Sequence, residues 1–392
     1  MKSISDDVFD TMEDQDLGVD ALAEALGIHV NSLYTFKKTG TIGFRSLLKI
    51  SQICYGERYH EKMREWCMQL STTEAIKHAF EYAAIKRDIE LLSRLLQNAG
   101  GDSSLEGYYN LYGLIYGYMI DVVSFTQLNK ELQRVKVAKD KVLLILVDIY
   151  KCYALYFEKD FLGIRMRAEA IKNEINKLKG ERKIFFKECY TIRLSELLMP
   201  INLHFRELSE CRAEAKIIIN ADISFKTQSD AYYCLAMSYL GIDKNRALAY
   251  IEKSLDLMKK VGNSGLVRES ISHKNLFIDY YCCRETGVLP DITMYDNKLR
   301  MGDDSDFIKY FQFRSQNSLE GLYLGYKHFF SKMNFLFCNL IADDLAGFGV
   351  DPLQVEALKS INFNKKESGL VNEENLVSSF NYRLCSCRSI VS

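Results

Sequence analysis

The segment from Gly27 to Gly56 combines polar and basic side chains in a pattern that suits DNA binding. Its polar side chains offer amide, hydroxyl and imidazole groups that can hydrogen-bond the edges of bases, and they are His29, Asn31, Ser32 and Thr35. Its basic side chains, with no Asp or Glu among them, are Lys37, Lys38, Arg45 and Lys49. We expect the polar group to read sequence and the basic group to hold phosphates, which makes binding sensitive to salt.

Two short helices joined by a tight turn must position these side chains. Gly27 can adopt the positive φ that the turn requires, and Ala23, four residues earlier, lets the first helix approach the second closely. The spacing therefore predicts a helix-turn-helix whose second helix carries the sequence-reading residues at its N-terminal end. The predicted apolar core of this small domain consists of Leu22, Leu26, Ile28, Leu33, Phe36, Leu47, Leu48 and Ile50.

The alternative is an ordinary helical hairpin in which Gly27 merely ends a helix. The acid-free basic segment and the Thr39-Gly40 stop favour the DNA-binding interpretation. One such domain makes few contacts, so we expect a homodimer on two DNA half-sites. The acidic residues 1–18 are predicted to form a further helix, because Val8, Met12 and Leu17 supply an apolar face.

The composition limits the kinds of protein that the chain can be. A length of 392 residues allows two or more domains, and a formal net charge of −1 argues against a protein that coats nucleic acid over its whole surface. The 11 cysteines form no CxxC pair and the first residues are acidic, so we expect a reducing, cytoplasmic location. Apolar runs such as 142–147 are too short for a membrane span, which predicts a soluble protein.

No motif for catalysis, phosphate binding or metal binding is present. GxxxxGK[ST], GxGxxG, HExxH and GxSxG are all absent, and no His lies at zinc-ligand spacing from a Cys pair. Asp343 and Asp344 are adjacent in sequence and so point apart on a helix, which does not suit paired catalytic carboxylates. We therefore predict no enzyme activity, no cofactor and no metal.

The remainder of the chain has the pattern of stacked helical hairpins. Apolar residues recur at three- and four-residue spacing, and the predicted helices pair as 60–71 with 73–85, 88–98 with 106–120, 139–158 with 160–178, 184–200 with 206–219, 228–240 with 244–260, and 265–283 followed by 306–330. The clearest unit has the large and small residues of a degenerate tetratricopeptide repeat, at Tyr232, Leu235, Ala236, Tyr239, Ala247, Ile251 and Ser254. A generic helical bundle is the alternative.

These patterns predict an all-α chain of three parts. A helix-turn-helix domain occupies 1–56, a degenerate tetratricopeptide-like superhelix occupies 57–350, and a C-terminal segment, a candidate for dimerisation, occupies 351–392. Loops are predicted at 99–104 and at 286–305, where Gly, Pro and acidic residues gather.

A DNA-reading head on such a body resembles the peptide-pheromone receptors of Gram-positive bacteria and their phages, the Rap, Rgg, NprR, PlcR and PrgX group, and within it the arbitrium receptors, AimR, of Bacillus phages. The similarity covers most of residues 20–345. It is strongest over Leu33-Tyr34-x-Phe36, Phe44, Tyr59, Met63, Trp66-Cys67, Leu70 and 79–83, and it resumes over Leu198-Met199, Leu208 to Arg212, 238–240 and Phe329-Phe330.

The resemblance implies a transcription regulator that binds a short phage peptide of about six residues and thereby changes its hold on an operator, controlling lysis against lysogeny. By local alignment Asn202 stands where the family binds the peptide backbone and Lys226 where it anchors the peptide, with Leu240 and Phe337 beside it. Asn can pair an extended peptide's amides and Lys a carboxylate. The alternative for each position is a solvated helical residue.

Two departures from the family pattern fall near this expected peptide site. Met237 stands where the family has a further Asn, and Phe335 stands near a family acid. Two other functions stay open: a pheromone-group scaffold whose head docks a protein partner, and a dimeric helix-turn-helix repressor without a ligand.

Overall fold

The computed structural model describes residues 2–135, 137, 140–291 and 305–361. The described residues form helices joined by turns, with no β-strand among them, which confirms the all-α prediction. The chain divides into two compact units, Met1–Ala154 with Glu169–Arg193, and Leu155–Ala168 with Leu194–Ser392.

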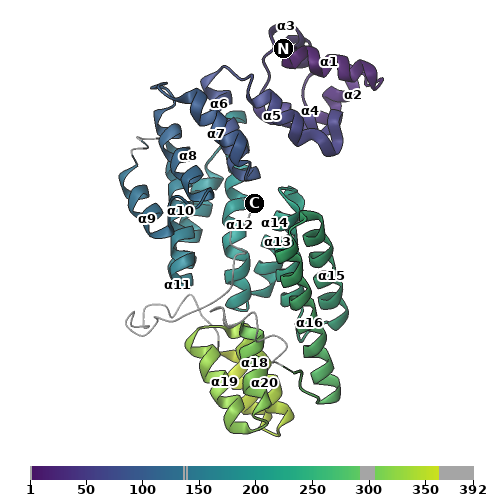
Figure 1. Cartoon of the computed structure of the whole chain (residues 1–392), viewed down its shortest axis with the longest axis vertical. Helices are drawn as coiled ribbons and strands as arrows, with labels where there is room; N and C mark the ends of the chain where they lie inside the picture. Colours follow the sequence, from purple (N-terminus) through teal and green to yellow (C-terminus); the bar gives the residue numbers. More distant parts are fainter. Residues whose placement is uncertain (1, 136, 138–139, 292–304, 362–392) are drawn as a thin grey trace. The chain divides into compact units, whose positions relative to one another are not determined.

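The first unit begins with four short helices and continues with five more (Figure 1). They are α1 (Ile4–Asp14), α2 (Val19–Leu26), α3 (Val30–Thr39), α4 (Phe44–Tyr55), α5 (Tyr59–Cys67), α6 (Thr73–Lys86), α7 (Ile89–Ala99), α8 (Glu106–Met119) and α9 (Phe125–Arg134). Three helices contribute residues to both units, namely α10 (Lys141–Glu158), α11 (Phe161–Asn176) and α12 (Glu181–His204).

The second unit contains the remaining helices. They are α13 (Leu208–Ala221), α14 (Phe225–Ser238), α15 (Lys244–Val261), α16 (Ser264–Thr286), α18 (Asp306–Ser315), α19 (Leu319–Ser331), α20 (Phe335–Gly347) and α21 (Pro352–Ser360). Helices α14, α15 and α16 pack side by side in chain order, as do α18, α19 and α20 (Figure 1). This sequential packing is the arrangement expected of stacked helical hairpins.

The first four helices share one small core. Helix α2 ends at Gly27 with φ +67°, and α3 ends at Gly40 with φ +69°, so both glycines adopt the left-handed conformation. Of the apolar residues predicted for this core, all are buried except Ile28 and Leu48, which are half-buried. The acidic N-terminal segment forms α1, as predicted, and buries Val8 and Met12 in the same core.

The predicted repeat unit is formed by α14 and α15. Ala236, Ala247 and Ser254 are buried. The close approach of the helices is visible in a reciprocal pair, because the Ser254 hydroxyl donates to the Ser229 carbonyl at 2.8 Å and the Ser229 hydroxyl donates to the Ser254 carbonyl at 2.7 Å. Tyr232 of α14 and Tyr239, which follows α14, contact a ring of α15. They are half-buried beside the Tyr250 ring, with centroid distances of 6.0 and 5.7 Å.

Several predicted boundaries were wrong. Helix α12 passes through Pro200 and ends at His204, because the buried residues around the proline hold the helix in place despite the missing N–H. The block 306–330 is divided into α18 and α19 at Asn317, whose φ is +45°, and Ser318 caps the second helix. Helices α9, α20 and α21 were not predicted.

The boundary predicted at residue 56 follows the end of α4, but the compact unit that contains residues 1–56 also contains α5 to α9. The three-part division therefore stays a prediction. Most of the predicted connection at 286–305 and residues 362–392 of the C-terminal segment lie outside the described residues.

Candidate functional site

Helix α3 exposes the side chains that the sequence predicted for reading DNA. Asn31, Ser32 and Thr35 are exposed, and so is His29, which caps the helix. Two of the four use a polar atom within the protein, because the backbone N–H of Asn31 donates to Nδ1 of His29 at 3.1 Å and the Thr35 hydroxyl donates to the Asn31 carbonyl at 2.8 Å.

The predicted phosphate-binding residues have different surroundings. Lys37 and Lys38 are exposed in the last turn of α3, and Nζ of Lys37 lies 4.8 Å from the centre of the Phe9 ring. Lys49 is half-buried on α4. Among the described residues no ion pair involves these three lysines.

Arg45 has a carboxylate partner. Its Nε and Nη2 donate to Oε1 of Glu188 at 3.0 and 2.7 Å, which makes a charge-assisted contact between α4 and α12. Both side chains remain part-exposed, at 38% and 47%. The sequence offered no signal for this pair, because 143 residues separate the partners.

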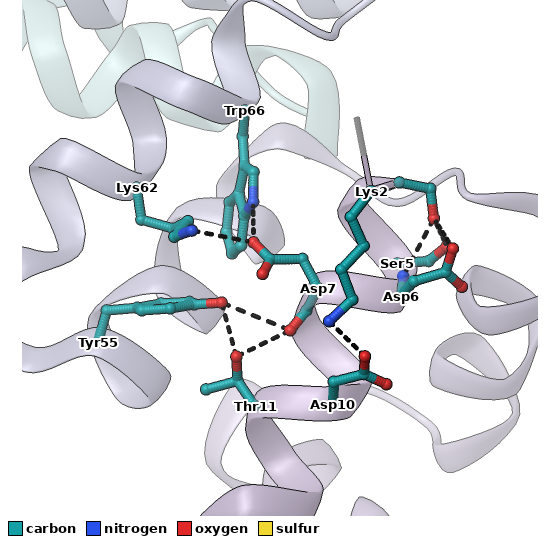
Figure 2. A network of polar contacts seen from close by, with 10 residues as sticks. Lys2, Ser5, Asp6, Asp7, Asp10, Thr11, Tyr55, Lys62 and Trp66 are labelled. Carbon is teal, nitrogen blue, oxygen red and sulfur yellow. Dashed lines mark hydrogen bonds and ion pairs between the residues drawn. The ribbon is translucent and has the colours of Figure 1, made fainter.

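Helix α1 connects the first four helices to α5 through a network of polar contacts, which Figure 2 shows. The indole N–H of Trp66 donates to Oδ2 of Asp7 at 2.9 Å, and Nζ of Lys62 lies 3.3 Å from the same oxygen. The hydroxyls of Tyr55 and Thr11 are 2.8 Å apart in the same network. This network fixes α1 against α4 and α5.

A second attachment is aromatic. Phe44, the first residue of α4, packs against the rings of His78, Tyr82 and Phe185, with centroid distances of 5.6, 6.0 and 5.1 Å. Nε2 of the buried His78 lies 2.8 Å from the carbonyl oxygen of Arg182. His78 thus joins α6 to α12 beneath α4, which is a structural role.

The four residues expected to contact a peptide lie in the second unit. Asn202 is on α12 and is 7% exposed, and Lys226 is near the start of α14, where Nζ lies 3.2 Å from Oδ2 of Asp230. Leu240 follows α14 and is 2% exposed. Phe337 in the first turn of α20 is fully buried against Phe307 and Phe329.

The structure thus places Leu240 and Phe337 as core residues, with Asn202 and Lys226 largely buried. Their assignment to a peptide site stays a prediction. The two departures from the family pattern, Met237 and Phe335, are also buried, at 0% and 5% exposure.

The adjacent carboxylates of α20 have separate structural partners. Asp343 pairs with Lys359. Asp344 accepts from Arg284 and Arg314 at 2.6 Å each and from the Tyr310 hydroxyl at 2.6 Å, and burial raises its pKa while these partners lower it. This pattern ties α16, α18 and α20 together.

The cysteines of the described residues form no disulfide with one another, and all except Cys282 are buried. Burial raises the pKa of Cys54 to about 11 and that of Cys211 to about 12, so these thiols stay protonated near neutral pH. Across the described residues no group of three or more His, Cys, Asp or Glu side chains could hold a metal ion. None of the described helices is long and apolar enough to cross a membrane.

Comparison with known proteins identifies a matching protein family. Residues 59–294 match a family model described as AimR transcriptional regulator-like, and this range is more than half of the chain. A search of curated proteins finds no match.

Solved structures show the same fold. A structure of phAimR containing selenomethionine has a TM-score of 0.66 at 17% identity, covering 91% of this chain and 100% of that one. A structure of phAimR with a ligand has a TM-score of 0.60 at 16% identity, covering 79% of this chain and 98% of that one.

Proposed function

Because the chain belongs to the AimR transcriptional regulator-like family, we propose that it regulates transcription by binding an operator through α3, under the control of a short peptide bound by its helical body. The observation that carries the DNA-binding half is the exposed polar face of α3, which follows a turn at a left-handed Gly27. Family membership also agrees with the predicted absence of enzyme activity.

The charge distribution supports DNA as the partner of this face. The segment 27–56 contains four basic residues and no acid, whereas the whole chain has 51 basic and 52 acidic residues. Positive charge is therefore concentrated beside the candidate reading residues. Such a patch neutralises phosphates and positions the helix in the groove. A homodimer on two half-sites would supply the affinity that one domain lacks.

A peptide can control this binding only if it binds the DNA-competent and the DNA-incompetent states with different affinities. The related phAimR has been solved with a ligand, which supports a ligand site in the body of this chain. In our proposal Lys226 meets a carboxylate and Asn202 pairs with peptide amides. Linkage then requires DNA and peptide to change each other's affinity by the same factor.

The test is a fluorescence anisotropy titration of purified full-length protein with the intergenic DNA that flanks its gene, repeated with each short peptide encoded immediately downstream and with a scrambled control. A specific complex whose affinity one peptide changes supports the proposal. A specific complex that no peptide changes indicates a regulator without a ligand. The absence of any specific complex overturns the DNA-binding role and favours a head that docks a protein.

A further inference from the structure

Tyr34 is the large apolar side chain that α3 exposes to solvent. It is 55% exposed, and within the described part of the chain it makes no hydrogen bond or ring contact. It lies three residues after Asn31 and four before Lys38, so the three side chains share one stripe of the helix. An exposed aromatic ring is therefore placed between a candidate base-reading amide and a candidate phosphate-binding lysine.

An exposed ring on this stripe suits an apolar feature of the DNA. The major groove presents one such feature, the 5-methyl group of thymine, and apolar side chains recognise it by contact. His29 and Thr35 use polar atoms for hydrogen bonds within α3, whereas the Tyr34 ring is uncommitted. Resting on the proposed function, we infer that the Tyr34 ring packs against a thymine methyl in each half-site and helps to determine which operator is bound.

The inference is tested on the DNA fragment that the wild-type protein binds, with each thymine replaced in turn by deoxyuridine, which removes only the methyl group. Wild-type binding should weaken about fivefold at one thymine of each half-site. Tyr34→Ala should bind the unmodified fragment about fivefold more weakly and should not respond to that replacement. Tyr34→Phe keeps the ring and should behave as the wild type.

Tyr109→Ala is the matched control, because Tyr109 is an exposed tyrosine of α8, at 41%, in the same unit. If wild-type protein binds specifically but Tyr34→Ala keeps its affinity and its response to every replacement, the inference fails while the proposed function stands. If Tyr34→Phe loses as much as Tyr34→Ala, the hydroxyl rather than the ring makes the contact, which also overturns the inference. Absence of any specific wild-type complex overturns both.

A separate observation concerns α12. Glu181, Phe185 and Glu188 are spaced by four and three residues, so they lie on one face of this helix, and each meets the start of α4. A Cβ at Gly43 would lie 2.9 Å from Oε1 of Glu181, Phe185 packs on Phe44, and Glu188 binds Arg45. Two carboxylates are thus held against the first residues of α4.

The start of α4 has the features that attract an anion. Gly43 caps the helix without a side-chain hydrogen bond, the helix dipole is positive at this end, and Arg45 adds a full charge. A DNA phosphate would bind to the same groups. We propose that Glu181 and Glu188 occupy this anion-binding position when DNA is absent. Helix α12 and the DNA backbone then compete for Arg45, and the Arg45–Glu188 contact weakens DNA binding.

Glu188→Gln removes one competing charge and keeps the side-chain shape. This variant should bind the operator about threefold to tenfold more tightly at moderate salt, and Arg45→Ala combined with Glu188→Gln should abolish the gain. Glu106→Gln is the control, since Glu106 is an exposed acid on α8 and the change in net charge is the same. Equal gains for both variants would indicate a general charge effect and would overturn the proposal. Weaker binding by Glu188→Gln with an unchanged thermal midpoint would also overturn it, because Glu188 would then position Arg45 for DNA.

Discussion

The indole N–H of Trp66 donates to a carboxylate oxygen of Asp7 at 2.9 Å, and this bond joins α5 to the N-terminal helix (Figure 2). Trp66 is fully buried, so removing the Asp7 carboxylate takes away the acceptor of a buried indole N–H. A buried donor left without an acceptor costs about 1–3 kcal/mol. This side-chain pair is therefore one of the contacts that hold α1 against α5.

We expect Asp7→Ala to lower the stability of this junction by about 1–3 kcal/mol, because the indole N–H loses its acceptor and Lys62 loses a part-exposed partner. Trp66 is the single tryptophan of the chain, so its fluorescence during urea unfolding reports on the junction directly. Asp10→Ala is the control, because the Asp10 pair with Lys2 is largely exposed. A midpoint that moves equally in both variants would show that the loss of an acid from α1, and not the indole bond, is responsible.

The adjacent lysines at the end of α3 test the phosphate role. The double variant Lys37→Ala, Lys38→Ala should weaken DNA binding and make the slope of log affinity against log salt shallower by about 2. A protein that makes two fewer phosphate contacts releases fewer counterions when it binds. Affinity is measured by anisotropy at four KCl concentrations.

A matched lysine pair exists elsewhere in the chain. Lys259 and Lys260 also occupy the last turn of a helix before a left-handed glycine, Gly262. Their replacement by Ala should leave the salt slope unchanged. A slope that stays at the wild-type value in the Lys37 and Lys38 variant would remove these residues from the phosphate contacts.

Local patterns were sufficient to predict the helix-turn-helix within the first four helices, α1 to α4. The positive φ of Gly27, the burial of Leu33 and Phe36 and the exposure of Asn31 all follow from spacing within about twenty residues. The pairing of α14 with α15 was equally accessible, because small residues at Ala236 and Ser254 mark a close contact between neighbouring helices. The spacing of apolar and small residues is therefore enough to predict the fold class and the packing of neighbouring helices.

Contacts between distant segments could not be predicted in this way. Nothing near Arg45 indicates that Glu188 would bind it, and nothing near Phe44 indicates that Phe185 would cover it. The boundary at Pro200 was wrong because tertiary burial outweighs the local cost of a proline. The core position of Phe337 likewise depends on contacts with Phe307 and Phe329, which lie on two other helices.

Lys226 offers a test of the peptide site. Its side chain is 11% exposed and its Nζ contacts Asp230, so a peptide carboxylate would join an existing charge pair. Lys226→Ala should weaken peptide binding about tenfold or more and leave DNA binding without peptide unchanged. Isothermal titration calorimetry with the peptides encoded downstream measures the first effect and anisotropy the second. Lys253→Ala, an exposed lysine on α15, is the control. Loss of both activities would indicate misfolding and would withdraw the assignment.

Buried His204 predicts a pH dependence of stability in the second unit. Burial lowers its pKa from 6.5 to about 4, and its Nε2 lies 3.0 Å from the carbonyl oxygen of Lys332, so the folded state holds a neutral imidazole that donates this bond. In the unfolded chain His204 binds a proton as the pH falls through 6.5, whereas in the folded chain it binds one only near pH 4. The stabilisation is therefore complete above pH 6.5 and is lost as the pH falls toward 4.

Between pH 7.5 and pH 5.5 the free energy of unfolding should fall by about 1 kcal/mol through this one group. The measurement is thermal unfolding followed by circular dichroism at both pH values for the wild type and for His204→Asn, whose amide N–H can replace the imidazole donor. The variant starts from a lower stability because it leaves a small cavity, so the informative quantity is the difference between the two pH values. That difference should be about 1 kcal/mol smaller in His204→Asn. An equal pH difference in both proteins would mean that other groups set the pH dependence and that His204 titrates alike in the folded and unfolded chains.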